Sequence, residues 1–435
     1  MKLAARWIAA TAALLLAAQL AAEPAPSSSP TIDRLAQLGD AARAAAVQAF
    51  WTEREGRGPL IEPGTRPAFS RVTFLFRDTP AVRTVTLDAP LGALLVAPGE
   101  LPEQAGHLRH VPGTDIWALT IEARNDLRTA YHFVITDSSP RPRHRPDALN
   151  PRRFAPDTPE EGSLLELPAA PPQPWADGAA PAGRWERTSM TGADHRAHDV
   201  FIYYPPGYDA HRARPYPVLV AQHSIEFGLE MPLGRILDRL IADRAIQPLL
   251  VVTTEEGGEG VDAMDRLAGH VGGELLPWLR SRANATRDPA QIAIAGASQR
   301  GLAAAYVAWT HPDVARGILS LSGAFYWSPP GDAEPEWLAR QIARSRARKP
   351  LRFFLAAGEL ETVVTPRNQG HYPLATTRHL RDVLNAAGYQ LCYAPFYGGH
   401  GAVNWQDALG AGLRCLFRAN GTTAHAPPRR RGYPN

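Results

Sequence analysis

Cysteine, charge imbalance and long apolar runs are all scarce in this 435-residue sequence. Its two cysteines are too few for a disulfide-rich scaffold or a cysteine-ligated zinc module. Its formal net charge of +3 argues against general binding of nucleic acids. Beyond the N-terminus, no apolar stretch is long enough to cross a membrane. These absences leave a globular protein, long enough for two domains or three.

The one strongly apolar segment lies at the N-terminus. A basic start precedes a short apolar run from Trp7 to Ala22, which is typical of a secretory signal peptide cleaved after Ala22. An uncleaved membrane anchor is the alternative, but the run is short for a membrane span. We therefore expect a periplasmic or secreted protein without stable membrane insertion. There, Cys392 and Cys415 can form a disulfide, and two buried free thiols are the alternative.

The pattern of apolar residues changes along the chain. Short alternating segments separated by turn residues predict an antiparallel β-sandwich in the first part. From Asp199 onward, apolar strands alternate with helical stretches, which predicts an α/β-hydrolase: a mostly parallel sheet with helices on both faces. The predicted divisions are a signal peptide (1–22), a flexible spacer (23–36), the N-terminal β-sandwich domain (37–160), a Pro/Ala-rich linker (161–184), the catalytic domain (185–420) and a basic disordered tail (421–435). Strands are expected at 72–76, 82–87, 117–121, 129–135, 200–204, 218–221, 249–252, 292–295, 351–357 and 390–397, and helices at 32–51, 274–280 and 371–387.

The most informative stretch is residues 292–305. A short apolar run breaks at a small-residue turn that contains Gly296 and Ser298, and an alanine-rich helix follows. An α/β-hydrolase presents its nucleophilic serine on such a tight strand-to-helix turn, with the helix N-terminus aimed at the hydroxyl. The usual pattern has glycine two residues after the serine, where this chain has Arg300 and then Gly301. The strand–turn–helix context around Ser298 therefore strongly indicates a nucleophile turn, although its glycine pattern is imperfect.

An acid and a histidine follow in the order that this fold class uses. A buried strand ends in a loop that carries Glu359 and Glu361, and the last strand ends in a glycine-rich loop that carries His400. All of these residues fall at the C-terminal ends of predicted strands. The predicted catalytic triad is therefore Ser298 as nucleophile, His400 as base and Glu361 as acid, with Glu359 as the alternative acid.

The reaction of a serine esterase also needs N–H donors for the oxyanion of its tetrahedral intermediate. The backbone N–H of Gln299, at the start of the helix, is one predicted donor. The second is predicted from Ser224 or Ile225, after the third strand of the catalytic domain. No metal or other cofactor is expected, since His195 and His198 have no convincing set of further ligands.

Segments of both predicted domains resemble, in the same order, one known family. They lie at 50–62, 72–77, 112–117, 147–151, 296–303, 320–327, 358–361 and 398–400, with Trp405 five residues after His400. The chain resembles the enterochelin esterases, the siderophore esterase family, over nearly its whole length after the signal. It departs from them at Arg300, at His223-Ser224, where the family has Asp-Gly, and at the abbreviated segment 266–273.

The resemblance implies a serine esterase that hydrolyses the lactone esters of a catecholate siderophore such as enterobactin, or of its ferric complex, through an acyl-enzyme, for iron release. Because a ferric catecholate is anionic, Arg300, Arg266 and Arg367 are candidates to contact it, and Trp327 and Trp405 are candidates to wall an aryl-binding cleft. One alternative is an exported esterase for a feruloyl or acetyl ester. The other is a non-catalytic binding protein, since Arg300 could crowd the turn. The expected partner is a small molecule and not a nucleic acid, and the oligomeric state is left open.

Overall fold

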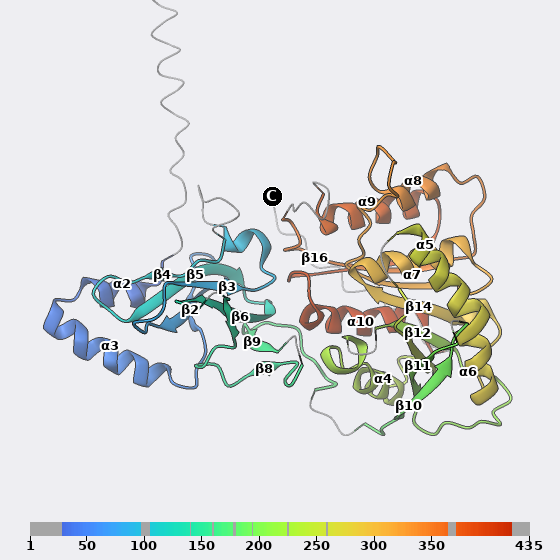
Figure 1. Ribbon diagram of the computed structural model, residues 1–435, viewed down its shortest axis with the longest axis horizontal. Helices are drawn as coiled ribbons and strands as arrows, with labels where there is room; N and C mark the ends of the chain where they lie inside the picture. Colours follow the sequence, from blue (N-terminus) through green and yellow to red (C-terminus); the bar gives the residue numbers. More distant parts are fainter. Residues whose placement is uncertain are drawn as a thin grey trace, which may run out of the picture.

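The computed structural model describes residues 28–96, 105–139, 141–158, 161–176, 180–193, 195–223, 226–257, 260–363 and 371–419. An N-terminal domain lies beside a larger C-terminal domain, which carries the catalytic candidates (Figure 1). The predicted signal peptide (1–22) and basic tail (421–435), together with Ser224, Ile225 and Arg367, lie outside the described residues.

Two helices precede the N-terminal sheets. The first, α2 (Pro30–Gln37), begins after Ser29, whose side chain accepts a hydrogen bond from the N–H of Ile32. The second, α3 (Asp40–Arg54), buries Phe50 and Trp51. Helix α2 occupies part of the predicted flexible spacer (23–36), so that prediction is wrong from Pro30 onward. The composition of the spacer suggested flexibility, but Ile32 and Leu35 are buried and fix the helix on the domain.

Antiparallel sheets form the N-terminal domain, as predicted. One sheet has the strand order β1-β2-β5-β4, and another has the order β3-β6-β9-β8, with β7 also paired to β6. The strands are β1 (Leu60–Pro63), β2 (Phe69–Arg77), β3 (Thr84–Asp88), β4 (Arg109–His110), β5 (Ile116–Arg124), β6 (Arg128–Thr136), β7 (Arg143–Arg145), β8 (Arg153–Phe154) and β9 (Gly162–Glu166), and the short 3-10 helix η1 (Gly92–Leu95) follows β3. Alternate residues of β2 and β6, among them Phe74 and Phe133, meet in a shared core.

Strand β9 corrects the predicted linker (161–184). It pairs with β6 from Arg128–Glu166 to Tyr131–Ser163, so the N-terminal sheet continues past the predicted boundary at residue 160. The proline- and alanine-rich sequence after β9 obscured a strand of five residues. The prediction missed it because β9 depends on its pairing with β6 and not on its own composition.

An eight-stranded sheet forms the centre of the second domain, with the order β10-β11-β13-β12-β14-β15-β16-β17. All pairs from β13 to β17 are parallel, whereas β10 and β11 pair antiparallel at one edge. The strands are β10 (Arg184–Thr191), β11 (Ala197–Tyr204), β12 (Val218–Gln222), β13 (Leu250–Thr254), β14 (Ile292–Ala297), β15 (Gly317–Leu321), β16 (Arg352–Gly358) and β17 (Gln390–Phe396).

Helices cover both faces of this sheet, as the alternation of strands and helices predicted. They are α4 (Leu233–Ala242), α5 (Val261–Gly269), α6 (Leu276–Arg282), α7 (Ser298–Thr310), α8 (Trp337–Arg344), α9 (Pro373–Ala386) and α10 (Ala402–Leu416), with shorter turns η3 (Glu226–Glu230), η4 (His270–Leu275) and η5 (Pro289–Gln291). Within β12, Val220 joins one buried cluster and Leu219 joins the cluster on the opposite face. Burial on both faces is what a parallel sheet requires.

A disulfide joins Cys392 in β17 to Cys415 in α10. The structure thus has the pair and not the two free thiols. Within the described part of the chain, no helix combines the length and the apolar character that a membrane span requires.

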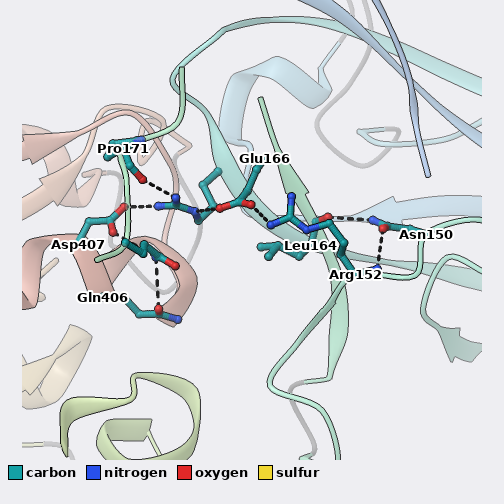
Figure 2. Close-up of polar contacts among 9 residues, drawn as sticks. Asn150, Arg152, Leu164, Glu166, Pro171, Gln406 and Asp407 are labelled. Atoms are coloured by element: carbon teal, nitrogen blue, oxygen red, sulfur yellow. Dashed lines mark hydrogen bonds and ion pairs between the residues drawn. The ribbon is translucent and has the colours of Figure 1, made fainter. Parts of the chain in front are cut away.

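A polar contact centred on Arg128 connects the two domains. Its guanidinium bonds Glu166 (2.5 Å) within the N-terminal domain and Asp407 (2.6 Å) on α10 of the other domain, and it also donates to the carbonyl of Pro171 (2.5 Å). Figure 2 shows Glu166, Pro171 and Asp407 in this arrangement. The Arg128 side chain is only 5% exposed. Burial raises the pKa of the Asp407 carboxyl, and Arg128 and Gln173 oppose that rise.

Candidate active site

The predicted nucleophile, Ser298, lies where β14 ends and α7 begins. Its φ angle is +53°, in the left-handed region that a residue with a side chain adopts only when its surroundings impose it. Strand β14 lies between β12 and β15, so the turn emerges near the centre of the sheet. This is the backbone geometry of a nucleophile elbow.

Two glycines explain how the elbow tolerates Arg300. A Cβ on Gly296 would collide with the backbone carbonyl of Arg300, so the first turn of α7 can approach β14 only over a glycine. A Cβ on Gly301 would lie 2.6 Å from Ser320 Oγ in β15. The second glycine is therefore required one residue later than in the usual pattern. The crowding that was considered for Arg300 does not distort the turn.

His400 and Glu361 form a hydrogen-bonded pair. Nδ1 of His400 lies 2.8 Å from Oε2 of Glu361. The Glu361 side chain is 1% exposed, and its other oxygen accepts hydrogen bonds from Ser322 Oγ (2.5 Å) and from the N–H of Gly358 (2.7 Å). A carboxylate held in this way fixes the orientation of the imidazole and leaves Nε2 to exchange protons.

Ser298 lines two cavities. A cavity of about 310 Å³ is lined by Ser298, Glu361, His400 and Tyr326, among others. A cavity of about 740 Å³ is lined by Ser298, Gln299, Tyr326 and Trp327, with the segment that follows. The three predicted triad residues thus share one cavity, and the serine also faces a larger, aromatic one.

Glu359, the alternative acid, is held by the N-terminal domain instead. Its carboxylate bonds the guanidinium of Arg124 at 2.6 Å. The same guanidinium pairs with Asp126 and lies 4.1 Å over the ring of Tyr397. The structure therefore brings Glu361 to His400, and it uses Glu359 to connect the domains.

This difference gives a paired prediction. We expect Glu361→Gln to lower kcat by about 10⁴-fold, because an amide cannot stabilise the imidazolium and can hold the wrong tautomer of His400. We expect Glu359→Gln to change kcat by less than about tenfold, since it removes a partly buried ion pair with Arg124 and leaves the His400–Glu361 pair in place. Steady-state hydrolysis of p-nitrophenyl butyrate measures both variants. Similar losses in the two variants would contradict the assignment of Glu361.

The two predicted aromatic contacts lie in different surroundings. Trp405 on α10 is 5% exposed, packs edge-on against the His400 ring at 5.0 Å between centroids, and donates to Ser322 Oγ at 2.9 Å. Its predicted role as a substrate contact therefore does not fit its position, and Trp405 is instead a buried support for His400 and Ser322. Trp327 is half-buried and lines the larger cavity beside Ser298.

The two described arginines that were predicted to contact substrate also lie in different surroundings. Arg266 on α5 lies 3.6 Å from Glu256 and lines another cavity, of about 610 Å³, whose described lining does not include Ser298. Arg300 stays beside the nucleophile, in the first turn of α7. Burial lowers the pKa of His223, which follows β12, and the charge of Arg300 lowers it further. Arg300 thus lies two residues after Ser298 without being among the described lining residues of either cavity at that serine, whereas Arg266 lines a separate cavity.

Gln299, the first predicted oxyanion donor, lies in the first turn of α7, where backbone N–H groups point out of the helix. It lines the larger cavity together with Ser298. The second donor was predicted from Ser224 or Ile225, and both lie outside the described residues.

The N-terminal domain supplies part of the site, through residues that the sequence analysis did not single out. Pro90 and Gly92 line the smaller cavity with Ser298 and His400. A Cβ on Gly399 would collide with the carbonyl of Pro90, and a Cβ on Gly92 would collide with the carbonyl of Leu360. Leu360 itself joins the hydrophobic core of the N-terminal domain. The loops that carry the acid and the histidine are therefore packed directly against the β3–η1 segment.

Comparison with known families agrees with both domains. The profile of the family described as "Putative esterase" matches residues 193–416. The profile described as "Enterochelin esterase, N-terminal" matches residues 71–176. The chain belongs to the esterase family and carries the N-terminal domain of the enterochelin esterases. This esterase is a carboxylic ester hydrolase, as the sequence predicted.

Curated relatives extend across both domains of the esterase. The iron(III) enterobactin esterase of Escherichia coli O6:H1 is 26% identical over 343 residues, which cover 72% of this chain and 82% of that protein. The iron(III) enterobactin esterase of Dickeya dadantii is 25% identical over 428 residues, which cover 86% and 93%.

Solved structures confirm the predicted fold. The ferric enterobactin esterase from Salmonella typhimurium has a TM-score of 0.67 at 21% identity, covering 85% of this chain and 98% of that one. The Shigella flexneri enterobactin esterase, crystallised in the presence of enterobactin, has a TM-score of 0.66 at 22% identity, covering 84% and 97%. An antiparallel β-sandwich followed by an α/β-hydrolase domain is therefore the shared architecture.

The contact of Gly92 gives a second prediction for this esterase. We expect Gly92→Ala to lower kcat/KM by about a hundredfold, because the new methyl group displaces the Leu360 carbonyl and with it the loop that holds Glu361. Gly207→Ala is the matched control, since Gly207 also has a positive φ (+67°) but has nothing within 4 Å of the added Cβ. Kinetics and thermal melting of both variants test the effect. Equal loss of activity in the two would show that backbone strain, and not the contact, is responsible.

Proposed function

We propose that this esterase hydrolyses the ester bonds of a catecholate siderophore, such as enterobactin or its ferric complex, and so releases iron. The observation that carries the proposal is the single cavity lined by Ser298, the His400–Glu361 pair, and Pro90 and Gly92 of the N-terminal domain. The domain that supplies this rim is the type found in enterochelin esterases. The curated relatives, named as iron(III) enterobactin esterases, support the choice of substrate class.

In the proposed reaction, His400 Nε2 accepts the proton of Ser298 while Oγ attacks the ester carbonyl. Glu361 orients the ring and stabilises the imidazolium. The N–H of Gln299 donates to the oxyanion, with a second donor from Ser224 or Ile225. The intermediate collapses to an acyl-enzyme as the alcohol leaves with the proton held by His400. Water then attacks the acyl group, with His400 again as base. The carboxylic acid is released, and the Ser298 hydroxyl is regenerated.

We propose that the larger cavity binds the catechol ring of an anionic catecholate. Tyr326 and Trp327 line it beside Ser298 and offer aromatic surface for stacking. Arg300 lies next to the nucleophile, and its Nε is buried without a hydrogen-bond partner among the described residues. Arg300 is not among the described lining residues of this cavity, but its positive charge two residues from Ser298 favours an anionic ferric catecholate.

We also propose that the reaction takes place outside the cytoplasm. The basic and apolar N-terminal sequence supports export, and so does the Cys392–Cys415 disulfide, because disulfides persist in oxidising compartments. Cell fractionation with mass spectrometry tests this. We expect a chain that begins at Glu23 in the periplasm or medium, and a cytoplasmic chain that retains its first residues would refute export.

The test of substrate is hydrolysis of enterobactin and its ferric complex by the purified protein, beside p-nitrophenyl butyrate and methyl ferulate, with Ser298→Ala as control. Cleavage of the trilactone that Ser298→Ala abolishes is the expected result. Activity on the simple esters alone would keep the triad and refute the siderophore substrate. Loss of neither activity in Ser298→Ala would refute the proposed nucleophile.

A further inference from the structure

Asp88, His132 and His144 gather on the N-terminal domain, outside the triad and its cavities. They come from three different strands: β3, β6 and β7. Strands β3 and β7 both pair with residues 133–135 of β6, so they flank β6 on opposite sides. Asp88 lies directly opposite His132, and His144 lies opposite Val134. The register of the sheet, and not any sequence motif, therefore brings the three side chains together.

The polar atoms of the cluster lie close to one another. Nε2 of His132 lies 2.9 Å from Nδ1 of His144 and 3.2 Å from Oδ2 of Asp88. One potential ligand atom from each residue lies within 4.8 Å of those of the other two. In a tetrahedral site with metal–ligand bonds of about 2.0–2.1 Å, neighbouring ligand atoms lie about 3.3 Å apart. The two distances from His132 Nε2, 2.9 and 3.2 Å, are close to that edge length, and the distance between the His144 and Asp88 ligand atoms is within 4.8 Å.

Hydrogen bonds among the three side chains alone cannot satisfy both neighbours of His132 Nε2. Nε2 of a neutral His132 either carries one proton or offers one lone pair. With the proton, it can donate fully to only one of its two neighbours. Without the proton, its lone pair faces the Asp88 carboxylate at 3.2 Å, which is repulsive. A cation between the three groups satisfies all of them at once.

We propose that Asp88, His132 and His144 bind a divalent transition-metal ion, with Zn²⁺ as the reference ion. Two imidazole nitrogens and one carboxylate oxygen are a donor set that such ions accept. Asp88 and His144 are exposed, and His132 is partly exposed, so water can complete the coordination. A bound ion ties the end of β3 to β6 and β7, two residues before Pro90 reaches the catalytic loops.

Isothermal titration of the full chain, purified without a polyhistidine tag and treated with a chelator that is then removed, tests this site. At pH 7.5 we expect one Zn²⁺ to bind per chain. His144→Ala and Asp88→Asn should each weaken binding by at least about tenfold. The control is His211→Ala, since His211 is also exposed but lies on a loop of the other domain, and it should leave the affinity unchanged.

Repeating the titration at pH 5.5 adds an independent readout. Affinity should fall because protons compete for the imidazole nitrogens. Circular dichroism of each variant checks that it is folded, and substitution of the exposed His144 should preserve the sheet. Absence of binding at pH 7.5, or binding that is weakened equally by His211→Ala and His144→Ala, would overturn the proposal.

Discussion

Replacement of Ser298 by alanine is expected to lower kcat for ester hydrolysis by about 10⁴-fold or more. In the proposed mechanism, the Ser298 hydroxyl forms the covalent intermediate, so its removal takes away the nucleophile. Binding and the oxyanion donors remain, so a small residual rate over water should persist. Because alanine fits the same turn with one atom fewer, the melting temperature should change little. Steady-state kinetics and thermal melting of the variant measure both expectations.

A double variant makes this test more specific. Triad residues act as a unit, so adding His400→Ala to Ser298→Ala should cost little further activity. Ser281→Ala is the control, since that exposed serine donates to the carbonyl of Trp278 on α6, away from the proposed site. If Ser298→Ala kept more than about a tenth of the activity, the nucleophile would lie elsewhere.

Arg128→Leu is expected to reduce the free energy of unfolding by about 3–5 kcal/mol. The arginine is 5% exposed, and its removal leaves the carboxylates of Glu166 and Asp407 without their buried cation. Urea denaturation followed by tryptophan fluorescence measures the loss. Arg239→Leu is the matched control: Arg239 pairs with Asp243 on the surface of α4, and its loss should cost less than about 1 kcal/mol.

The pH dependence of this loss separates charge burial from lost packing. Burial raises the pKa of Asp407 above its ordinary 3.8. A carboxyl with a raised pKa contributes stability that is fully present below its unfolded pKa and is lost as pH rises through its folded pKa. Without Arg128 that pKa rises further, so the deficit of Arg128→Leu should shrink between pH 7 and pH 5. Adding Asp407→Asn should recover part of the deficit at pH 7. If the loss of unfolding free energy in Arg128→Leu changed neither with pH nor on adding Asp407→Asn, lost packing alone would explain it.

The elements around Ser298 were predictable because their signals are local. A strand, a small-residue turn and an alanine-rich helix are written in consecutive residues, and so is each strand that precedes Glu361 and His400. Parallel strands bring their C-terminal ends to one edge of the sheet, so the order of these residues along the chain was enough to place them together. The choice between Glu359 and Glu361 needed the structure, because it depends on Arg124 of the other domain.

What could not be predicted depends on pairs far apart in the chain. Arg128 and Asp407 are 279 residues apart, and neither lies in a recognisable pattern. Pro90 and Gly92 reach the catalytic loops only because one domain packs on the other. Trp405 was misjudged because aromatic composition does not distinguish a cleft wall from a buried support.

The Cys392–Cys415 disulfide has a consequence for the unfolded chain. The two cysteines are 23 residues apart, and His400 lies between them. When noncovalent structure is lost, the disulfide persists, and the segment that contains His400 remains a closed loop. For a loop of this size, the restriction is worth about 3 kcal/mol of unfolded-state entropy. The segment that carries the proposed base thus gains less freedom on denaturation than it would without the bond.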